Sequence, residues 1–445
     1  MNIPVLFTKI KSISVFFSIG IILCTASIMA ITPQQASSQT FSPVKNLSSD
    51  SDVDSHPFVV KSGNKVYVVW PGDNDILFRR STDNGVTFQP TKNLSNDPGS
   101  NGKPRMAASG NSVYVVWEGS PSSGGRDIFI VRSTDGGSNF DSPVNLSNNA
   151  GDTENPKVAA SGSNVYVVWA DESPGNFEVL FKRSTNNGAS FGSTQNLSNN
   201  PPESLSPEIR ASGKNVYVVW DDDSTGPQDI FYKRSTNNGA SFGSTKNLSG
   251  GINGGAGKVL TSGKNVYVTW QSGTDIFFKR STNEGASFGS AKNLSNNPGE
   301  SGQADIAASG NNVYVVWNDD TGISTGNCNA SEHGCDVLFR ASNNKGASFS
   351  STINLSNNPG ASYNTNVLSS GKSVYVLWLD ATPGNFEIFF RASNDKGSSF
   401  DSTINLSGNS GTSYYSDMSR KGNNAYVVWS DDTIGSNEIF FRKGS

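Results

Sequence analysis

Charged and amide side chains recur at one position of a repeated pattern, five residues before a closing glycine. Guanidinium and ammonium groups at such a position bind carboxylates and other anions, and a pair of carboxylates can hydrolyse a glycosidic bond. Cations gather in the second to fifth repeats and anions in the sixth to eighth, with Glu208 as an exception. The pattern predicts a polar, charge-divided binding site. In chain order the position holds Phe58, Arg105, Lys157, Glu208, Lys258, Asp305, Asn366 and Asp417, and Arg210 follows Glu208 by two residues.

Two further groups of residues fall in loops near this position. Asp221, Asp223, Asp319 and Asp320 belong to a set of acidic residues that often lie two positions after a tryptophan; they either cap turns or hold Ca²⁺ through carboxylate oxygens. No other cofactor is predicted. Three tyrosines outside the repeat pattern are candidates for stacking on a sugar or anchoring a partner protein, with core packing as the alternative. They are Tyr363, Tyr414 and Tyr415.

These side chains are carried by a strand pattern that repeats about every fifty residues. All eight tryptophans end the same kind of run, as in Asn265-Val266-Tyr267-Val268-Thr269-Trp270. Such a run, apolar at nearly every position, is typical of a strand buried on both faces. A second β-rich run, a tight turn, a third run ending in Asn-Leu-Ser, and a fourth run follow. Four short strands per unit predict an all-β fold, a single β-propeller of eight four-stranded blades, with six or seven blades as the alternative.

The charged position lies near the start of the fourth run, which we expect to be the innermost strand of the next blade. The residue after it is apolar in every unit, so strand alternation points the charged set into a central channel and the apolar set into the blade packing. A water-filled channel lined by polar residues without any ligand is the alternative. The apolar set is Val59, Met106, Val158, Ile209, Val259, Ile306, Val367 and Met418.

The two ends of the repeated region complement each other. The eighth unit stops at Ser445 after its third strand, and residues 41–48 match the missing outer strand. Pairing them would close the ring and remove an open sheet edge. We therefore predict a closed ring rather than a linear β-solenoid.

The turns between the second and third strands resemble the Asp boxes, or BNR repeats, of sialidases and related propellers. The first two read Ser81-Thr82-Asp83-Asn84-Gly85-Val86-Thr87-Phe88 and Ser133-Thr134-Asp135-Gly136-Gly137-Ser138-Asn139-Phe140, and five looser copies begin at Ser184, Ser235, Ser281, Ser342 and Ser393. The resemblance spans nearly the whole chain after its first forty residues and implies a sialidase-like propeller. Four of the copies carry Asn at the acidic position, which suits a hydrogen-bonded turn better than a catalyst.

The catalytic residues that the resemblance would imply are not identifiable. Sialidases need an arginine cluster, a tyrosine nucleophile with a glutamate, an acid/base aspartate and, in many, an early Phe/Tyr-Arg-Ile-Pro segment, which this sequence lacks. We interpret the arginines beside the turns as one repeat position that belongs to the scaffold. They are Arg80, Arg132, Arg183, Arg234, Arg280, Arg340, Arg391 and Arg442.

The first residues indicate export. Lys9 and Lys11 precede an apolar run, so residues 1–30 are expected to form a signal peptide or an uncleaved signal anchor, 31–40 a linker and 41–445 the propeller. A secreted or cell-surface location makes a local disulfide between Cys328 and Cys335 the simplest pairing. The sequon at Asn329 is the best glycosylation candidate, because the eight Asn-Leu-Ser sequons share one strand-end position.

The composition excludes some partners. The net charge is only -4, with no block of basic residues, so no nucleic-acid surface is predicted. We expect a monomer, attached to a membrane only if the signal anchor is retained. The leading hypothesis is a non-catalytic propeller that binds a glycan or a surface protein through its variable loops. A sialidase-like exo-glycosidase, with Arg105 and Arg210 holding an anionic sugar, and a structural cell-envelope component are the alternatives.

Overall fold

The structure is a computed structural model that describes residues 39–48, 54–96, 99–120, 125–320 and 335–445. The chain divides into two compact units, Met1–Ser37 and Ser38–Ser445, and the first lies outside the described residues. The expected signal segment and most of the linker therefore stay predictions. In the described part of the chain there are strands and turns but no helix, hence none that could cross a membrane.

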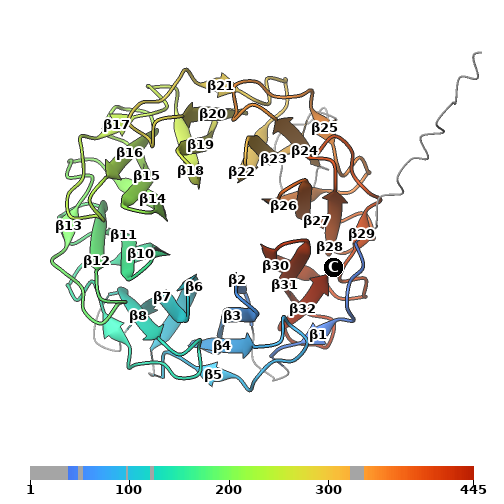
Figure 1. Cartoon of the computed structure of the whole chain (residues 1–445), viewed down its shortest axis with the longest axis horizontal. Helices are drawn as coiled ribbons and strands as arrows, with labels where there is room; N and C mark the ends of the chain where they lie inside the picture. Colours follow the sequence, from blue (N-terminus) through green and yellow to red (C-terminus); the bar gives the residue numbers. More distant parts are fainter. Residues whose placement is uncertain (1–38, 49–53, 97–98, 121–124, 321–334) are drawn as a thin grey trace, which may run out of the picture. The chain divides into compact units, whose positions relative to one another are not determined.

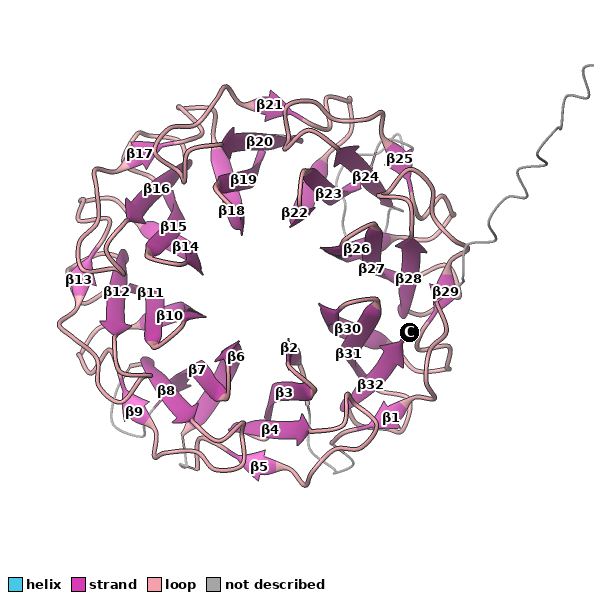
Figure 2. Ribbon diagram, viewed as in Figure 1, coloured by secondary structure: helices cyan, strands magenta, loops and turns pink. Residues whose placement is uncertain are grey.

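Eight four-stranded antiparallel sheets form the blades of a ring (Figure 1). Each blade runs from the central opening to the rim, as Figure 2 shows. The innermost strands are β2 (Phe58–Ser62), β6 (Ser100–Ser109), β10 (Thr153–Ser161), β14 (Ser204–Ser212), β18 (Gly254–Ser262), β22 (Ser301–Ser309), β26 (Ser362–Ser370) and β30 (Ser413–Lys421). The second strands are β3 (Lys65–Gly72), β7 (Ser112–Ser120), β11 (Asn164–Asp171), β15 (Asn215–Asp222), β19 (Asn265–Ser272), β23 (Asn312–Asp319), β27 (Ser373–Asp380) and β31 (Asn424–Asp431).

The outer half of each blade is shorter. The third strands are β4 (Asp75–Ser81), β8 (Asp127–Ser133), β12 (Glu178–Ser184), β16 (Asp229–Ser235), β20 (Asp275–Ser281), β24 (Asp336–Ser342), β28 (Glu387–Ser393) and β32 (Glu438–Gly444). The outermost strands are β5 (Lys92–Asn93), β9 (Val144–Asn145), β13 (Gln195–Asn196), β17 (Lys246–Asn247), β21 (Lys292–Asn293), β25 (Ile353–Asn354), β29 (Ile404–Asn405) and β1 (Lys45–Asn46). The eight-bladed prediction is confirmed, and counts of six or seven are wrong.

Ring closure follows the predicted pairing of the two ends. The last blade has the strand order β1-β32-β31-β30, with Lys45 opposite Phe441. Leu47 is buried in a core that also contains Trp70 and Phe441, so blade 1 packs directly on blade 8. The first segment of the ring therefore completes the last blade and covers the edge of β32.

A buried tryptophan lies at each junction between neighbouring blades. Each is fully buried and packs against the preceding blade, as Trp169 does against Val116 and Ile130. In six blades the indole N–H donates to an acidic or amide side chain at the end of the sheet where the loops vary; Trp220 Nε1, for example, lies 2.9 Å from Asp222 Oδ2. Because a buried donor without a partner is costly, this bond ties the loop end of these six blades to their cores.

The turns at the opposite end of the blades close on their own side chains. Ser81 Oγ accepts from Gly85 N at 2.8 Å, and Asp83 Oδ1 accepts from Thr87 N at 2.9 Å. Asn186 accepts from Ser190 N at 3.0 Å in the same way, so the amide can replace the carboxylate. These residues are fully engaged in shaping the turn.

The interpretation that the eight arginines beside these turns share one repeat position is wrong, because they occupy two adjacent positions. Arg80 lies opposite Tyr67 and donates to Gly136 O of the next blade at 2.9 Å. Arg391 lies opposite Val376, one residue earlier in the repeat, and donates to Leu355 O of the preceding blade at 2.9 Å. Arg340 and Arg442 share the second position. Adjacent strand residues face opposite sides, so Arg391 and Arg442 bond to the preceding blade, whereas Arg340 bonds to Thr352 of its own blade. These contacts are consistent with the scaffold role that we assigned.

Deleting residues 41–48 tests the closure. We expect a melting temperature several degrees lower, or aggregation, because β32 would become an open edge and Trp70 would lose Leu47 from its cluster. The comparison is a chain that lacks only residues 1–38, measured by thermal denaturation. An unchanged melting temperature would mean that the β1–β32 pairing contributes little.

Candidate functional site

The eight charged or variable positions form what we call the channel ring: Phe58, Arg105, Lys157, Glu208, Lys258, Asp305, Asn366 and Asp417. All sit at equivalent register in the innermost strands, opposite the residue that precedes each tryptophan; Glu208, for instance, lies opposite Val219. The apolar residues that follow them are buried in seven of the eight blades, and Val158 is partly buried. The predicted alternation is therefore present around the central opening (Figure 1).

A basic arc is the most connected part of the channel ring. Glu208 Oε1 lies 2.6 Å from Lys157 Nζ and 3.1 Å from Lys258 Nζ, and Glu208 Oε2 lies 3.6 Å from Arg210 Nη1. Glu208 is nearly buried, whereas the Arg210 and Lys258 side chains are 46% and 40% exposed. One buried carboxylate thus holds three cations in place, and two of them present much of their charge to solvent. Arg105 continues this arc in blade 2.

The electrostatics of this arc follow from burial and pairing. Burial lowers the pKa of Lys157 to about 8, although Glu208 opposes the shift. The neighbouring cations hold the pKa of Glu208 well below its ordinary value despite its burial. Glu208 raises the pKa of Lys258. At neutral pH the arc consequently carries a net positive charge.

The acidic positions have a structural task. Asp417 Oδ2 accepts from Val59 N of blade 1 at 2.8 Å, and Asp305 Oδ2 accepts from Val367 N of blade 7 at 2.9 Å. Burial raises the pKa of Asp417 to about 7 and raises that of Asp305. Between them, Asn366 Oδ1 is buried without a hydrogen-bond partner in the described structure. The acidic half of the channel ring therefore links neighbouring innermost strands.

Apart from Tyr415, a second ring of residues was missed by the sequence reasoning. In seven blades the innermost strand has a register shift just before the channel ring, as between Leu205 and Glu208. In all eight blades the residue two positions before the channel ring has a positive φ and is at least partly exposed. These bulge positions are His56, Lys103, Asn155, Ser206, Ala256, Gln303, Asn364 and Tyr415. Comparing the repeats at this position would have found their variation, but not the bulge that exposes them.

The predicted tyrosines separate into two environments. Tyr363 is 9% exposed and packs in a core cluster, with its ring 5.2 Å from that of Phe386. Tyr415 is 42% exposed and stacks on His56 with ring centroids 3.5 Å apart, while Tyr414 lies 6.2 Å from Tyr415. Of the three predicted tyrosines, only Tyr414 and Tyr415 are therefore placed to meet a ligand.

Three of the four Ca²⁺ candidates accept hydrogen bonds through their carboxylates, and the fourth, Asp223, is exposed. Asp319 Oδ2 accepts from Trp317 Nε1 at 3.0 Å and from Ser301 Oγ at 2.7 Å. Asp221 accepts from Ala256 N at 3.1 Å, and burial raises its pKa to about 6. Asp320 accepts from Glu300 N at 2.5 Å, and Asp223 follows Asp222 directly. In the part of the chain that the structure covers, no three His, Cys, Asp or Glu side chains gather as a metal site.

The predicted disulfide and glycan lie partly beyond what the structure describes. Cys335 is buried at the start of β24, but Cys328 and Asn329 fall outside the described residues. Both modifications stay predictions.

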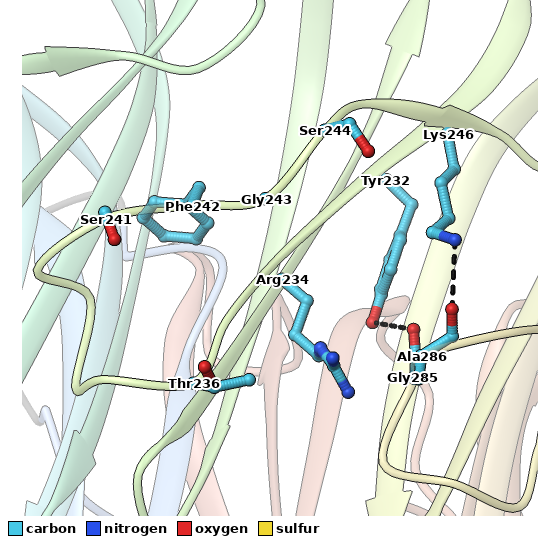
Figure 3. A pocket seen from close by; sticks show the side chains of 10 residues that line it. All are labelled: Tyr232, Arg234, Thr236, Ser241, Phe242, Gly243, Ser244, Lys246, Gly285 and Ala286. Atoms are coloured by element: carbon cyan, nitrogen blue, oxygen red, sulfur yellow. Dashed lines mark hydrogen bonds between the residues drawn. The ribbon is translucent and has the colours of Figure 1, made fainter.

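A pocket of about 400 Å³ lies at the opposite end of blades 4 and 5 (Figure 3). Tyr232 Oη donates to Gly285 O at 3.1 Å and Lys246 Nζ donates to Ala286 O at 3.0 Å, so both side chains bridge to the next blade. Arg234 does the same through Glu284 O at 2.7 Å. The lining consists of repeat positions, which makes this pocket part of the scaffold.

Comparisons with known proteins show the fold. The sequence matches no protein-family model and no curated protein. An ulvan lyase, a polysaccharide lyase, aligns with a TM-score of 0.52 and 13% identity over 91% of this chain and 95% of its own. A prolyl endopeptidase aligns with a TM-score of 0.51 and 12% identity, over 85% of this chain and 55% of its own. The NanB sialidase of Streptococcus pneumoniae aligns with a TM-score of 0.41 and 10% identity, over 85% of this chain and 83% of its own. The protein is an eight-bladed β-propeller with structural neighbours among sialidase, polysaccharide lyase and arabinanase propellers.

Asp417→Asn tests how burial affects the acidic half of the channel ring. The folded-state pKa of about 7 exceeds the ordinary value of 3.8, so the folded protein binds an extra proton between these values and loses stability as pH rises through this window. The amide keeps an acceptor for Val59 N–H without a buried charge. We expect Asp417→Asn to melt above the unmodified protein at pH 8, with the difference disappearing near pH 4.

Asp395→Asn is the matched control. Hydrogen bonds from Ser399 and Ser393 outweigh burial and lower the pKa of Asp395 in its turn, so its ionised form is favoured. This variant should not gain stability at pH 8. Equal pH dependence of all three proteins would contradict the assignment.

Proposed function

We propose that this protein is an exported, non-catalytic propeller that binds an acidic carbohydrate across the end of the channel where the loops vary. We call this end the variable face; it comprises the loops after each tryptophan and those leading into the innermost strands. The observation that carries the proposal is the basic arc, in which Glu208 orients Lys157, Lys258 and Arg210.

The arc is suited to sugar acids because its charges are fixed but remain accessible. Arginine binds carboxylate or sulfate in a planar, two-pronged geometry, and lysine adds charge without a strict direction. The basic positions of the channel ring and the bulge positions differ from blade to blade, so the repeat itself does not fix which residue they carry. A polar site with several converging donors is what a hydrophilic polymer requires.

The fold neighbours are consistent with this proposal. The ulvan lyase was solved bound to -[GlcA(1-4)Rha3S]-, which contains a uronate and a sulfated sugar. That ligand belongs to the lyase, and the 13% identity transfers only the fold. Binding without catalysis is proposed because the sequence contains no identifiable sialidase set. A surface protein is the alternative partner.

Charge-neutral variants test the binding site. We expect Arg210→Gln and Lys258→Gln to weaken binding to immobilised polygalacturonate by about tenfold each, which corresponds to about 1.4 kcal/mol. Lys214→Gln and Lys264→Gln are the controls, because both lysines are exposed in the hairpins at the opposite face. Affinity would be measured by surface plasmon resonance, with neutral dextran as the second surface.

Two results would contradict this proposal. One is a failure of the charge test: either no polysaccharide in a panel of acidic and neutral polymers binds, or all four variants bind polygalacturonate equally well. The other is turnover of a fluorogenic sialoside that Arg105→Ala abolishes, which would make the protein a hydrolase.

The affinity should also depend on pH. The pKa of Lys157 is about 8, so its charge is lost as pH rises from 7 to 9, and binding of an acidic glycan should weaken over that range. Lys258 keeps its charge, since its pKa is raised. Lys157→Gln should bind less tightly at pH 7 and show a flatter pH profile. A profile unchanged by this substitution would remove Lys157 from the site.

A further inference from the structure

Two aromatic rings meet at the variable face where blade 8 joins blade 1. Tyr415 belongs to β30 and His56 precedes β2, and these two strands and β6 are neighbours around the central opening (Figure 1). The ring planes are 25° apart with centroids separated by 3.5 Å. Both side chains are exposed, and Tyr414 adds a third ring nearby. The cluster therefore offers aromatic surface to solvent at the channel mouth.

The fold does not require aromatic residues there. His56 and Tyr415 occupy bulge positions with φ of 44° and 40°, a region that bulky side chains seldom adopt. In other blades the same position is filled by Ser206, Ala256 or Asn364. Because these repeats form the same bulge without an aromatic side chain, the rings of blades 1 and 8 have no scaffold role in common with the other blades.

Two cations of blade 2, Arg105 and Lys103, act electrostatically on His56 of the stacked pair. The Arg105 guanidinium lies 5.6 Å from the centre of the ring of Phe58, two residues after His56. Lys103 occupies the bulge position of blade 2, with its side chain 49% exposed and its Nζ 3.2 Å from Glu118. Burial, then Arg105 and Lys103, lowers the pKa of His56. The imidazole is accordingly neutral at pH 7 and contributes a flat ring rather than a charge.

We propose that His56, Tyr415, Arg105 and Lys103 form a subsite for one acidic sugar unit, with the pyranose ring against the aromatic surface and its carboxylate or sulfate on the cations. Aromatic side chains supply contact area at a low entropy cost, and arginine supplies direction. The subsite deepens the proposed function and rests on it. It lies in blades 8, 1 and 2, apart from the Lys157–Glu208–Lys258 network of blades 3 to 5.

The competing explanation is that the stack only fastens blade 8 to blade 1. A residue found at the same position in another blade provides a substitution that separates fastening of the blades from sugar binding. Tyr415→Asn places at blade 8 the residue type that blade 7 carries at its bulge, Asn364, so the backbone conformation is retained. Tyr415→Phe keeps the ring, and Asn364→Ser is the control at an equivalent position with no aromatic ring.

The experiment is calorimetric titration of the full chain with oligogalacturonate, dextran sulfate and neutral dextran, together with melting curves. Tyr415→Asn should weaken binding of the preferred acidic ligand by about tenfold, and Arg105→Gln should remove the preference for acidic ligands over dextran. Tyr415→Phe and Asn364→Ser should bind as the unmodified protein does. Tighter binding of oligogalacturonate would identify a carboxylate as the ligand group, and tighter binding of dextran sulfate a sulfate.

Three results would overturn the subsite, and they differ from failure of the proposed function. A lower melting temperature with unchanged affinity in Tyr415→Asn would make the stack a fastener. An undiminished preference of Arg105→Gln for the acidic ligands over dextran would remove the role of that cation. Binding lost in Arg210→Gln and Lys258→Gln, but intact in Tyr415→Asn and Arg105→Gln, would leave the function standing without this subsite. If none of the three ligands binds the unmodified protein, both proposals fail.

Discussion

The burial of one tryptophan between each pair of blades is the constraint on which the rest of this structure depends. An indole fills the space between two sheets, but it also brings an N–H group that needs an acceptor. In blades such as the fourth, Asp222 supplies that acceptor from the loop end of the sheet. The first residues of the variable loops are therefore part of the core, and freedom to vary begins only beyond them. Many acidic residues at the variable face therefore serve as acceptors for the buried indoles.

The same constraint divides the two faces of the propeller. At one end, serine, aspartate or asparagine, and glycine close each turn, and arginines and lysines bond to carbonyls of neighbouring blades. All seven turns use these residues in nearly the same way. At the other end, the bulge lets successive blades present different side chains at the channel mouth. Function on a symmetric scaffold is best sought where the blades differ.

Charge at the channel is organised by burial rather than by sequence order. Glu208 interrupts a run of cations in the repeat comparison, yet it is the residue that holds them together. The acidic residues on the other side bond to backbone N–H groups of the next blade, and burial raises their pKa values although these hydrogen bonds oppose the shift. The two halves of the channel ring thus differ in availability as well as in sign.

The sequence by itself determined the all-β class, the eight blades, the closing strand and the register of the channel ring, because period-two alternation and the tryptophan repeat are local signals. It placed Arg105, Lys157 and Lys258 on one surface but could not show that Glu208 pairs with the two lysines, since those contacts cross between blades. It also treated eight arginines as one position, although three of them lie one residue earlier in the strand and face its other side. Only the tertiary structure decided that Tyr363 is core while Tyr415 meets His56, because ring closure brings together residues more than three hundred positions apart.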